Sequence, residues 1–227
     1  MFRIKICGIT NVEDALAAAE AGADAIGLNF FEQSPRHVPR ETALQIAAVL
    51  PKNLKKVGVF VNATPIEIRS LHQYLSFDLV QLHGDEPPEL LSTLIGIPVI
   101  RAFRPDGDWA FIQNYLIRCN SLNCSPAMVL IDSFSASQYG GTGETANWSA
   151  LRKNRPLFGQ LPVVLAGGLR PENVAHAIET ALPSAVDTAS GVEISPRHKS
   201  HQQMQAFVAA ARTAFDLTGE SGYARGA

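Results

Sequence analysis

The sequence lacks the cysteine spacing of a metal site or a disulfide framework. Its three cysteines, Cys7, Cys119 and Cys124, form no CxxC pair, and no histidine cluster has metal-ligand spacing. A sparse, odd-numbered set of this kind is typical of a reducing compartment. We therefore expect a cytoplasmic protein with no metal.

Long apolar runs and blocks of like charge are also missing. Apolar stretches such as residues 128–131 and 161–166 are far shorter than the roughly 18 to 20 residues that cross a bilayer. The N-terminus has no apolar segment followed by a small-residue cleavage site, so we expect no signal peptide. The net charge is −2, from 19 Lys and Arg against 21 Asp and Glu. We expect neither a membrane nor a nucleic acid as partner.

A unit of apolar strand, turn and amphipathic helix recurs along the chain, and we find eight copies. The predicted strands are residues 3–7, 24–29, 56–61, 77–82, 98–103, 127–131, 161–166 and 185–188. The predicted helices begin near Asn11, Arg40, Pro65, Pro87, Asp108, Trp148, Pro171 and Ser200. Thr10 or Asn11 can cap the first helix, and Pro65 and Pro171 suit a first helical position.

This alternation predicts parallel strands joined by right-handed crossovers, and eight such units close into a barrel. We therefore predict a single (β/α)8 TIM barrel over residues 1–217, with a frayed polar tail over residues 218–227. An open doubly wound sheet would use the same alternation, but no GxGxxG turn follows the first strand.

Barrel active sites lie at the carboxyl ends of the strands, and this rule selects Cys7. Alternation places Lys5 and Cys7 on the inward face of the first strand. A lone cysteine is often only a small buried hydrophobe, but Cys7 ends its strand and precedes Gly8. It is a candidate general base, for which inward-facing Lys5 would stabilise the thiolate.

Asp132 is the candidate general acid. It shares the inward face of the sixth strand with Leu130 and opens a glycine-bearing loop, residues 133–146. A cap of the loop is the alternative role. A thiol and a carboxyl group at one barrel mouth offer a base and an acid, which is what an isomerisation requires.

Two glycine-bearing turns follow the seventh and eighth strands. They contain Gly167 and Gly168, and Ser190 and Gly191, respectively. Barrels frequently bind phosphate with backbone N–H groups of these two loops, although each could be a plain turn. Residues 138–143 suggest a loop that covers the substrate, because they lack the P-loop pattern.

Three further residues are candidates for substrate binding. Arg36 could hold a carboxylate in a bidentate fork, or be a solvated loop residue. His83 could change its protonation state or orient the substrate, or it could simply be hydrogen-bonded to neighbouring backbone groups. Asp187 could hold a substrate hydroxyl, but a structural ion pair with Lys5 is the favoured interpretation.

An ordered set of motifs resembles the phosphoribosylanthranilate isomerase family along nearly the whole chain. The motifs are KICGIT at 5–10, GADAIG at 22–27, SPR at 34–36, VGVFVN at 57–62, VQLHG at 80–84, Asp132 with GGTG at 140–143, AGGL at 166–169 with PEN at 171–173, and SGVE at 190–193.

The resemblance implies an Amadori rearrangement of a phosphorylated small molecule in tryptophan biosynthesis, without a cofactor. It implies that Asp132 protonates the furanose ring oxygen and that Cys7 removes the C2 proton. It further implies that Arg36 holds the anthranilate carboxylate and that the backbone around Gly168, Ser190 and Gly191 holds the phosphate. We expect a monomer or a homodimer.

The chain departs from the family pattern at three loop positions: Glu144 in place of a frequent lysine, Asn147 in place of an acidic residue, and Arg197 where a glycine is usual. Two rival functions are considered. The related isomerase of histidine biosynthesis has an aspartate where Cys7 stands. A phosphate-binding barrel without turnover would need neither Cys7 nor Asp132 as a proton carrier.

Overall fold

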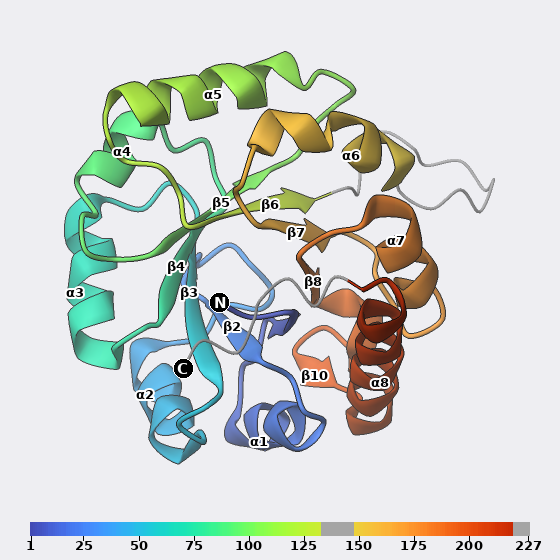
Figure 1. Ribbon diagram of the computed structural model, residues 1–227. Helices are drawn as coiled ribbons and strands as arrows, with labels where there is room; N and C mark the ends of the chain where they lie inside the picture. The colour runs from blue at the N-terminus through green and yellow to red at the C-terminus, as the bar shows by residue number, and fades with distance from the viewer. Residues whose placement is uncertain (133–147, 220–227) are drawn as a thin grey trace.

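The structure is a computed structural model that describes residues 1–132 and 148–219. Eight parallel strands form a closed barrel in chain order, with β1 pairing both β2 and β8 (Figure 1). The strands are β1 Ile4–Cys7, β2 Ala25–Asn29, β3 Lys55–Phe60, β4 Leu79–Leu82, β5 Val99–Phe103, β6 Met128–Asp132, β7 Val163–Ala166 and β8 Ala185–Thr188. The predicted (β/α)8 barrel is confirmed.

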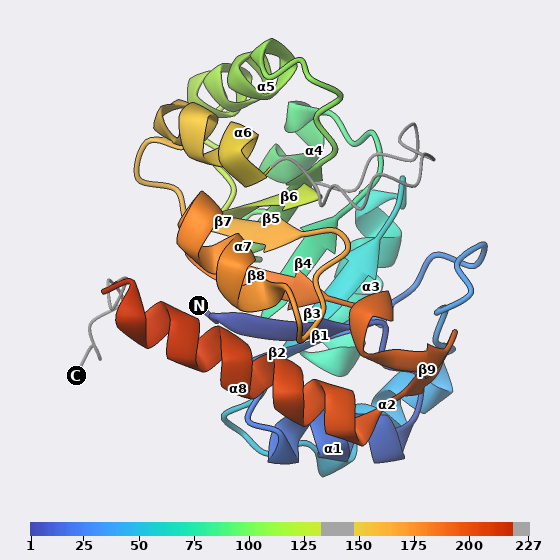
Figure 2. The ribbon, with the colours of Figure 1, turned by 90° about the vertical axis from the view of Figure 1, so that its right-hand side faces the viewer.

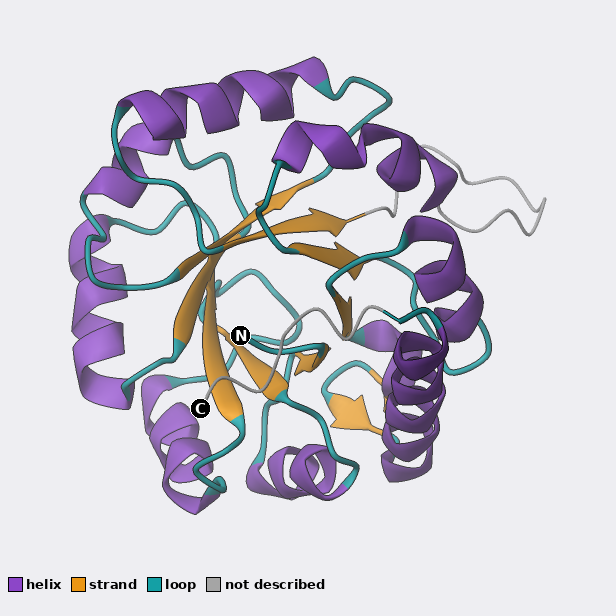
Figure 3. Cartoon of the chain, viewed as in Figure 1, coloured by secondary structure: helices purple, strands orange, loops and turns teal. Residues whose placement is uncertain are grey.

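Helices surround the barrel, as the purple ring in Figure 3 shows. They are α1 Val12–Glu20, α2 Arg40–Val49, α3 Pro65–Leu75, α4 Pro88–Ser92, α5 Ala110–Ser121, α6 Trp148–Asn154, α7 Val174–Ala181 and α8 His201–Leu217. Two 3₁₀ turns, η1 Arg155–Phe158 and η2 Ser190–Val192, follow α6 and β8. The predicted tail begins directly after α8, and its residues from 220 onward lie outside the described part of the chain.

Side-chain caps explain where several helices begin. Asn11 accepts a hydrogen bond from the Asp14 N–H at 2.7 Å and thereby caps α1. Thr64 and Glu67 form a reciprocal capping box around Pro65, which starts α3 as predicted. Thr10 has another role, because its hydroxyl donates to the Arg197 carbonyl at 3.0 Å.

The prediction that Pro171 begins a helix is wrong, because α7 begins at Val174. The Asn173 side chain closes a turn in front of the helix. It accepts from the Arg170 N–H at 2.7 Å and donates to the Gly168 carbonyl at 3.0 Å. Together with backbone bonds from the Asn173 and Val174 N–H groups to the Arg170 carbonyl, these side-chain bonds hold residues 170–173 in a turn that precedes the helix.

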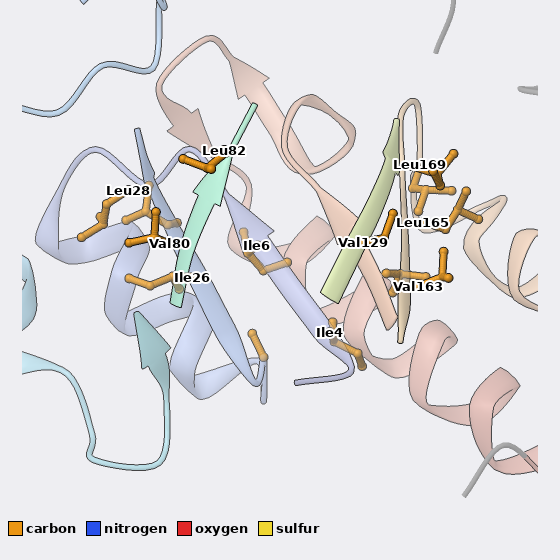
Figure 4. Close-up of a cluster of buried hydrophobic side chains, with 14 of the residues drawn as sticks. Ile4, Ile6, Ile26, Leu28, Val80, Leu82, Val129, Val163, Leu165 and Leu169 are labelled. Carbon is orange, nitrogen blue, oxygen red and sulfur yellow. The ribbon is translucent and has the colours of Figure 1, made fainter. Parts of the chain in front are cut away.

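Successive side chains of each strand point alternately outward, beneath the helices, and inward, into the barrel, so that two apolar layers form. Outward side chains of β1, β2, β4, β6 and β7 pack beneath the helices, and Figure 4 labels Ile4, Ile26 and Val129 among them. A second cluster fills the barrel interior, with Val57, Ile100 and Leu130 among its members. Toward the carboxyl ends of the strands the inward positions become polar, at Lys5, Gln81 and Asp187. This change places polar chemistry at one end of an otherwise apolar barrel.

A small antiparallel hairpin, β9 Glu193–Ser195 with β10 His198–Lys199, follows β8 and was not predicted. In Figure 2 the β1 arrow points toward the side on which β9 lies. The hairpin therefore stands at the end of the barrel where the carboxyl ends of the strands meet.

Candidate active site

A cavity of about 560 Å³ opens at the carboxyl ends of the strands. All the site residues predicted from the sequence line it, contributed by β1, β6, β8 and the loops after β2, β4, β7 and β8. They are Cys7, Arg36, His83, Asp132, Gly167, Gly168, Asp187, Ser190 and Gly191.

Cys7 ends β1 and is half-buried at the cavity wall. Its partner in the neighbouring strand is Gly27, where a Cβ atom would come within 2.6 Å of the Cys7 Sγ atom. A glycine at this position therefore provides the space that the thiol occupies.

Lys5 and Asp187 form an ion pair beneath Cys7. They are direct partners across the β1–β8 seam, and Lys5 Nζ lies 2.9 Å from Asp187 Oδ2. Burial lowers the pKa of Lys5, but Asp187 and Cys7 outweigh it, so this pKa is raised. The second Asp187 oxygen, Oδ1, is buried without a hydrogen-bond partner among the described residues. Asp187 can thus accept one further hydrogen bond from the cavity side.

The pKa of the Cys7 thiol differs from the expectation that Lys5 would stabilise the thiolate. Burial raises the pKa of Cys7, and the attraction of Lys5, which acts in the opposite direction, does not overcome it. The negative charge of Asp187 also raises this pKa, because it repels the thiolate. Lys5 is therefore the cationic neighbour that was predicted, but the resting thiol is protonated at neutral pH.

Asp132 ends β6, and its carboxylate faces two basic groups. Oδ2 lies 3.6 Å from His83 Nε2 and 3.6 Å from Arg104 Nε. Gln81 Nε2 lies 2.9 Å from His83 Nδ1. With the Gln81 amide as donor, a neutral His83 carries its proton on Nε2, toward Asp132. The loop of residues 133–146, with its predicted covering role, Glu144 and Asn147 lie outside the described residues.

The loop that carries His83 is held from behind by a buried charge. Glu86 accepts hydrogen bonds from the Asn62 N–H at 2.8 Å and the Gly84 N–H at 2.9 Å. Its carboxylate lies 3.3 Å from Nη1 of buried Arg101. Because both partners are buried and multiply bonded, they fix the backbone next to His83.

The loops after β7 and β8 lie against each other. Gly167 and Gly168 have φ of +93° and +65°, a region that side chains disfavour. A Cβ atom at Gly191 would collide with the carbonyl oxygen of Leu169, which also accepts from the Thr188 hydroxyl at 2.7 Å. Glycine is required here for a close backbone approach, which leaves a wall of backbone groups beside the cavity.

Arg36 is engaged by a residue that the sequence did not suggest. Its Nε and Nη2 donate to Glu193 Oε1 at 2.8 Å and Oε2 at 2.6 Å. Hydrogen bonding to Glu193 raises the pKa of Arg36. Lys199 Nζ also donates to Glu193 Oε1, at 2.9 Å.

Sequence reasoning missed four residues at or beside the cavity: Gln81, Arg104, Glu193 and Lys199. The alternation that selected His83 also places Gln81 and Arg104 inward, so this signal was available. For Glu193 and Lys199 no periodic signal existed, because they lie on strands of three and two residues.

No metal or membrane feature is found in the described part of the chain. Residues 1–132 and 148–219 contain no group of three or more His, Cys, Asp or Glu side chains placed to hold a metal ion. None of the helices in those ranges is long and apolar enough to cross a membrane.

A closed (β/α)8 barrel with a thiol, a carboxylate and paired glycine loops around one mouth is the arrangement of a barrel enzyme. Residues 4–210 match the sequence profile of N-(5'-phosphoribosyl)anthranilate (PRA) isomerase. The chain belongs to this family.

Individual relatives agree along almost their whole length. The N-(5'-phosphoribosyl)anthranilate isomerase of Geobacter sulfurreducens is 44% identical over 214 residues, covering 93% of this chain and 99% of that protein. The crystal structure of phosphoribosyl anthranilate isomerase from Thermotoga maritima has a TM-score of 0.82 and 40% identity, covering 94% of this chain and all of that one.

A second solved structure is of phosphoribosyl anthranilate isomerase in complex with reduced 1-(o-carboxyphenylamino)-1-deoxyribulose 5-phosphate. It has a TM-score of 0.80 and 39% identity, and covers 94% of this chain and 100% of that chain.

Proposed function

We propose that this protein converts N-(5-phosphoribosyl)anthranilate into 1-(2-carboxyphenylamino)-1-deoxyribulose 5-phosphate, an Amadori rearrangement in tryptophan biosynthesis. Membership of the isomerase family supports this function. The observation that carries the proposal is that Cys7 and Asp132 line the same cavity from different strands. A base and an acid at one mouth are what an aldose-to-ketose isomerisation requires.

In the proposed mechanism Asp132 is the general acid. Its protonated carboxyl group gives a proton to the furanose ring oxygen as the ring opens, which leaves a positively charged imine at C1. His83 and Arg104, both near Oδ2, stabilise the carboxylate that remains.

Cys7 then acts as the general base. The thiolate takes the proton from C2, the C2–H electrons form the enolamine double bond, and the imine nitrogen becomes neutral. Tautomerisation of the enolamine gives the ketone. The resting thiol is protonated, so it first releases its proton to solvent, and Lys5 favours the resulting thiolate by Coulombic attraction.

The remaining cavity residues bind the substrate in this proposal. Backbone N–H groups near Gly168 and Gly191 hold the phosphate, since glycine allows it to approach the backbone closely. Arg36 holds the anthranilate carboxylate. Asp187 accepts from a substrate hydroxyl through Oδ1, which has no other partner among the described residues. No cofactor takes part in any of these steps.

Turnover of freshly generated phosphoribosylanthranilate, followed by loss of its fluorescence, tests the function. We expect wild-type turnover, and a kcat about 10² to 10⁴ lower in Cys7→Ala and in Asp132→Asn, because each loses a general acid or base. Circular dichroism verifies folding. Wild-type-like turnover in either variant would remove that residue from the mechanism.

The rival isomerase of histidine biosynthesis is tested in the same assay. An inactive wild-type protein that isomerises the histidine-pathway substrate would replace the proposed reaction. Binding of phosphate ligands without turnover of either substrate would identify a binding protein.

We further propose that the protein acts in the cytoplasm as a monomer or a homodimer, with a phosphorylated small molecule as its substrate and with neither a nucleic acid nor a membrane as partner. Its cysteines are free. One structural relative is described as mutually generated monomers of a dimeric isomerase from Thermotoga maritima. Light scattering after size-exclusion chromatography measures the oligomeric state.

A further inference from the structure

The β9–β10 hairpin connects the loop that carries Arg36 to Cys7 at the end of β1. From the hairpin, Glu193 binds the guanidinium of Arg36, and Lys199 Nζ donates to the Cys7 carbonyl at 2.7 Å. Arg197 Nη1 lies 3.2 Å from the carbonyl of His37, next to Arg36. Figure 2 shows β9 on the side where the loop after β2 also extends. The hairpin thus contacts the first two βα loops together.

Glu193 engages one particular edge of Arg36. A guanidinium has two edges that can hold a carboxylate: the side edge, with Nε and Nη2, and the end edge, with Nη1 and Nη2. Glu193 takes the side edge with both oxygens. Nη1 donates to no atom among the described residues, and Arg36 lines the cavity. The end edge is therefore available to a second carboxylate.

Lys199 makes this arrangement rigid. Its side chain is fully buried, and Nζ donates to three oxygens: the Cys7 carbonyl, the Ala189 carbonyl at 2.9 Å and Glu193 Oε1. Three donated bonds satisfy an ammonium group completely. Only 4% of the Glu193 side chain is exposed. Hydrogen bonds from Arg36 and Lys199 lower the pKa of Glu193 against the effect of its burial, so it stays ionised.

We propose that Glu193 is a positioning residue that holds the side edge of Arg36, so that the end edge meets the carboxylate of the substrate. Lys199 fixes Glu193 to the backbone of Cys7, and the carboxylate-binding group and the general base are thereby kept at a constant separation. This inference rests on the proposed function and adds to it a determinant of specificity for a carboxylated substrate.

The role predicts an effect on binding rather than on the chemical step. In Glu193→Gln, an NH₂ donor replaces one of the two carboxylate oxygens. It cannot accept a hydrogen bond from the Arg36 guanidinium, so the two-bond contact with Arg36 is lost. Arg36 then loses its orientation but keeps its charge. We expect KM for phosphoribosylanthranilate to rise about tenfold, with a much smaller change in kcat.

A double-mutant cycle tests whether Glu193 acts through Arg36. Steady-state kinetics are measured for wild type, Glu193→Gln, Arg36→Ala and the double variant. We expect Glu193→Gln to raise KM in the wild-type background and to add nothing in the Arg36→Ala background. Effects on KM that multiply in the double variant, or an unchanged KM in Glu193→Gln, would overturn the inference.

Two further variants separate positioning from folding. Glu193→Asp keeps a charge for Lys199 but is one methylene shorter, so it should lose the Arg36 fork and show the same rise in KM. Glu41→Gln removes a carboxylate from the exposed start of α2 and should behave as wild type. Circular dichroism confirms that each variant folds.

The two proposals fail in different ways. If wild-type protein does not turn over phosphoribosylanthranilate, the proposed function is wrong. If wild type is active and folded Glu193→Asp has an unchanged KM, the function stands and the positioning role of Glu193 is wrong.

Discussion

The Cys7 thiol is more protonated at rest than its neighbour Lys5 alone would suggest. Burial raises the pKa of Cys7, and the attraction of Lys5, which lies 2.9 Å from Asp187, is opposed by the negative charge of Asp187 and does not overcome the effect of burial. Cys7 is therefore mainly a protonated thiol at neutral pH, and its reactivity toward alkylating reagents should depend on pH.

We predict that the rate of Cys7 alkylation by iodoacetamide is low at pH 7 and is still increasing above pH 8.5. The reason is that the pKa of Cys7 lies above the ordinary thiol value of about 8.5. The sign follows from the raised pKa, because the reactive thiolate forms only at higher pH. Peptide mass spectrometry measures the rate at each cysteine. Burial raises the pKa of Cys119 to about 12, so this residue provides a slow internal reference. A midpoint below pH 8 for Cys7 would contradict the prediction.

Single residues were predictable from the sequence where strand alternation applied. Cys7, His83, Asp132 and Asp187 all line the cavity because each occupies an inward position at a strand's carboxyl end. The fork between Arg36 and Glu193 could not be predicted, since it joins residues 157 positions apart through a hairpin without an apolar pattern.

At the scale of elements, the strand–helix repeat contained enough information for all eight barrel strands. Periodicity was less reliable where a side chain holds a turn in front of a helix, as Asn173 does before α7 begins at Val174. The β9–β10 hairpin was missed because strands of three and two residues are too short to show alternating hydrophobicity. Its turn residue, Arg197, also has a positive φ, which is typical of glycine and gives no turn signal at an arginine.

Arg197 has φ of +76°, in the left-handed region where a side chain costs about 1 to 2 kcal/mol. We predict that Arg197→Gly is more stable than Arg197→Ala by about 1 kcal/mol, because only glycine relieves the strain while both lose the guanidinium bonds. Urea denaturation measures the difference. Equal midpoints would show that this turn is not strained.

At the scale of the whole molecule, stability depends on carboxylates that are ionised in the folded state. The pKa of Glu193 is lowered, so the folded protein binds its proton less readily than the unfolded chain does. The stabilisation is therefore present above the unfolded value of about 4.3 and is lost as pH falls through the lower, folded value. Asp78, whose pKa is also lowered, acts in the same direction, whereas the raised pKa of Asp187 opposes it.

We predict that wild type exceeds Glu193→Gln in free energy of unfolding by about 1.5 to 3 kcal/mol at pH 7, since charged hydrogen bonds are lost in the variant. The difference should shrink as pH falls from 5 to 3, because Glu193 becomes neutral in wild type too. Urea titrations of both proteins at pH 7, 5 and 3 measure it. A constant difference across this range would assign the stabilisation to groups other than the Glu193 carboxylate.

The pairing of β1 with β8 cannot form on the ribosome until the last barrel strand has been translated. Lys5 and its partner Asp187 are 182 positions apart, and the Lys199 that holds the Cys7 carbonyl is translated later still. Cys7 therefore leaves the exit tunnel well before the residues that surround it have been synthesised. A nascent chain released before β8 carries the proposed general base without the residues that surround it, and in a cell-free translation isomerase activity would begin only after β8 and Lys199 have been synthesised.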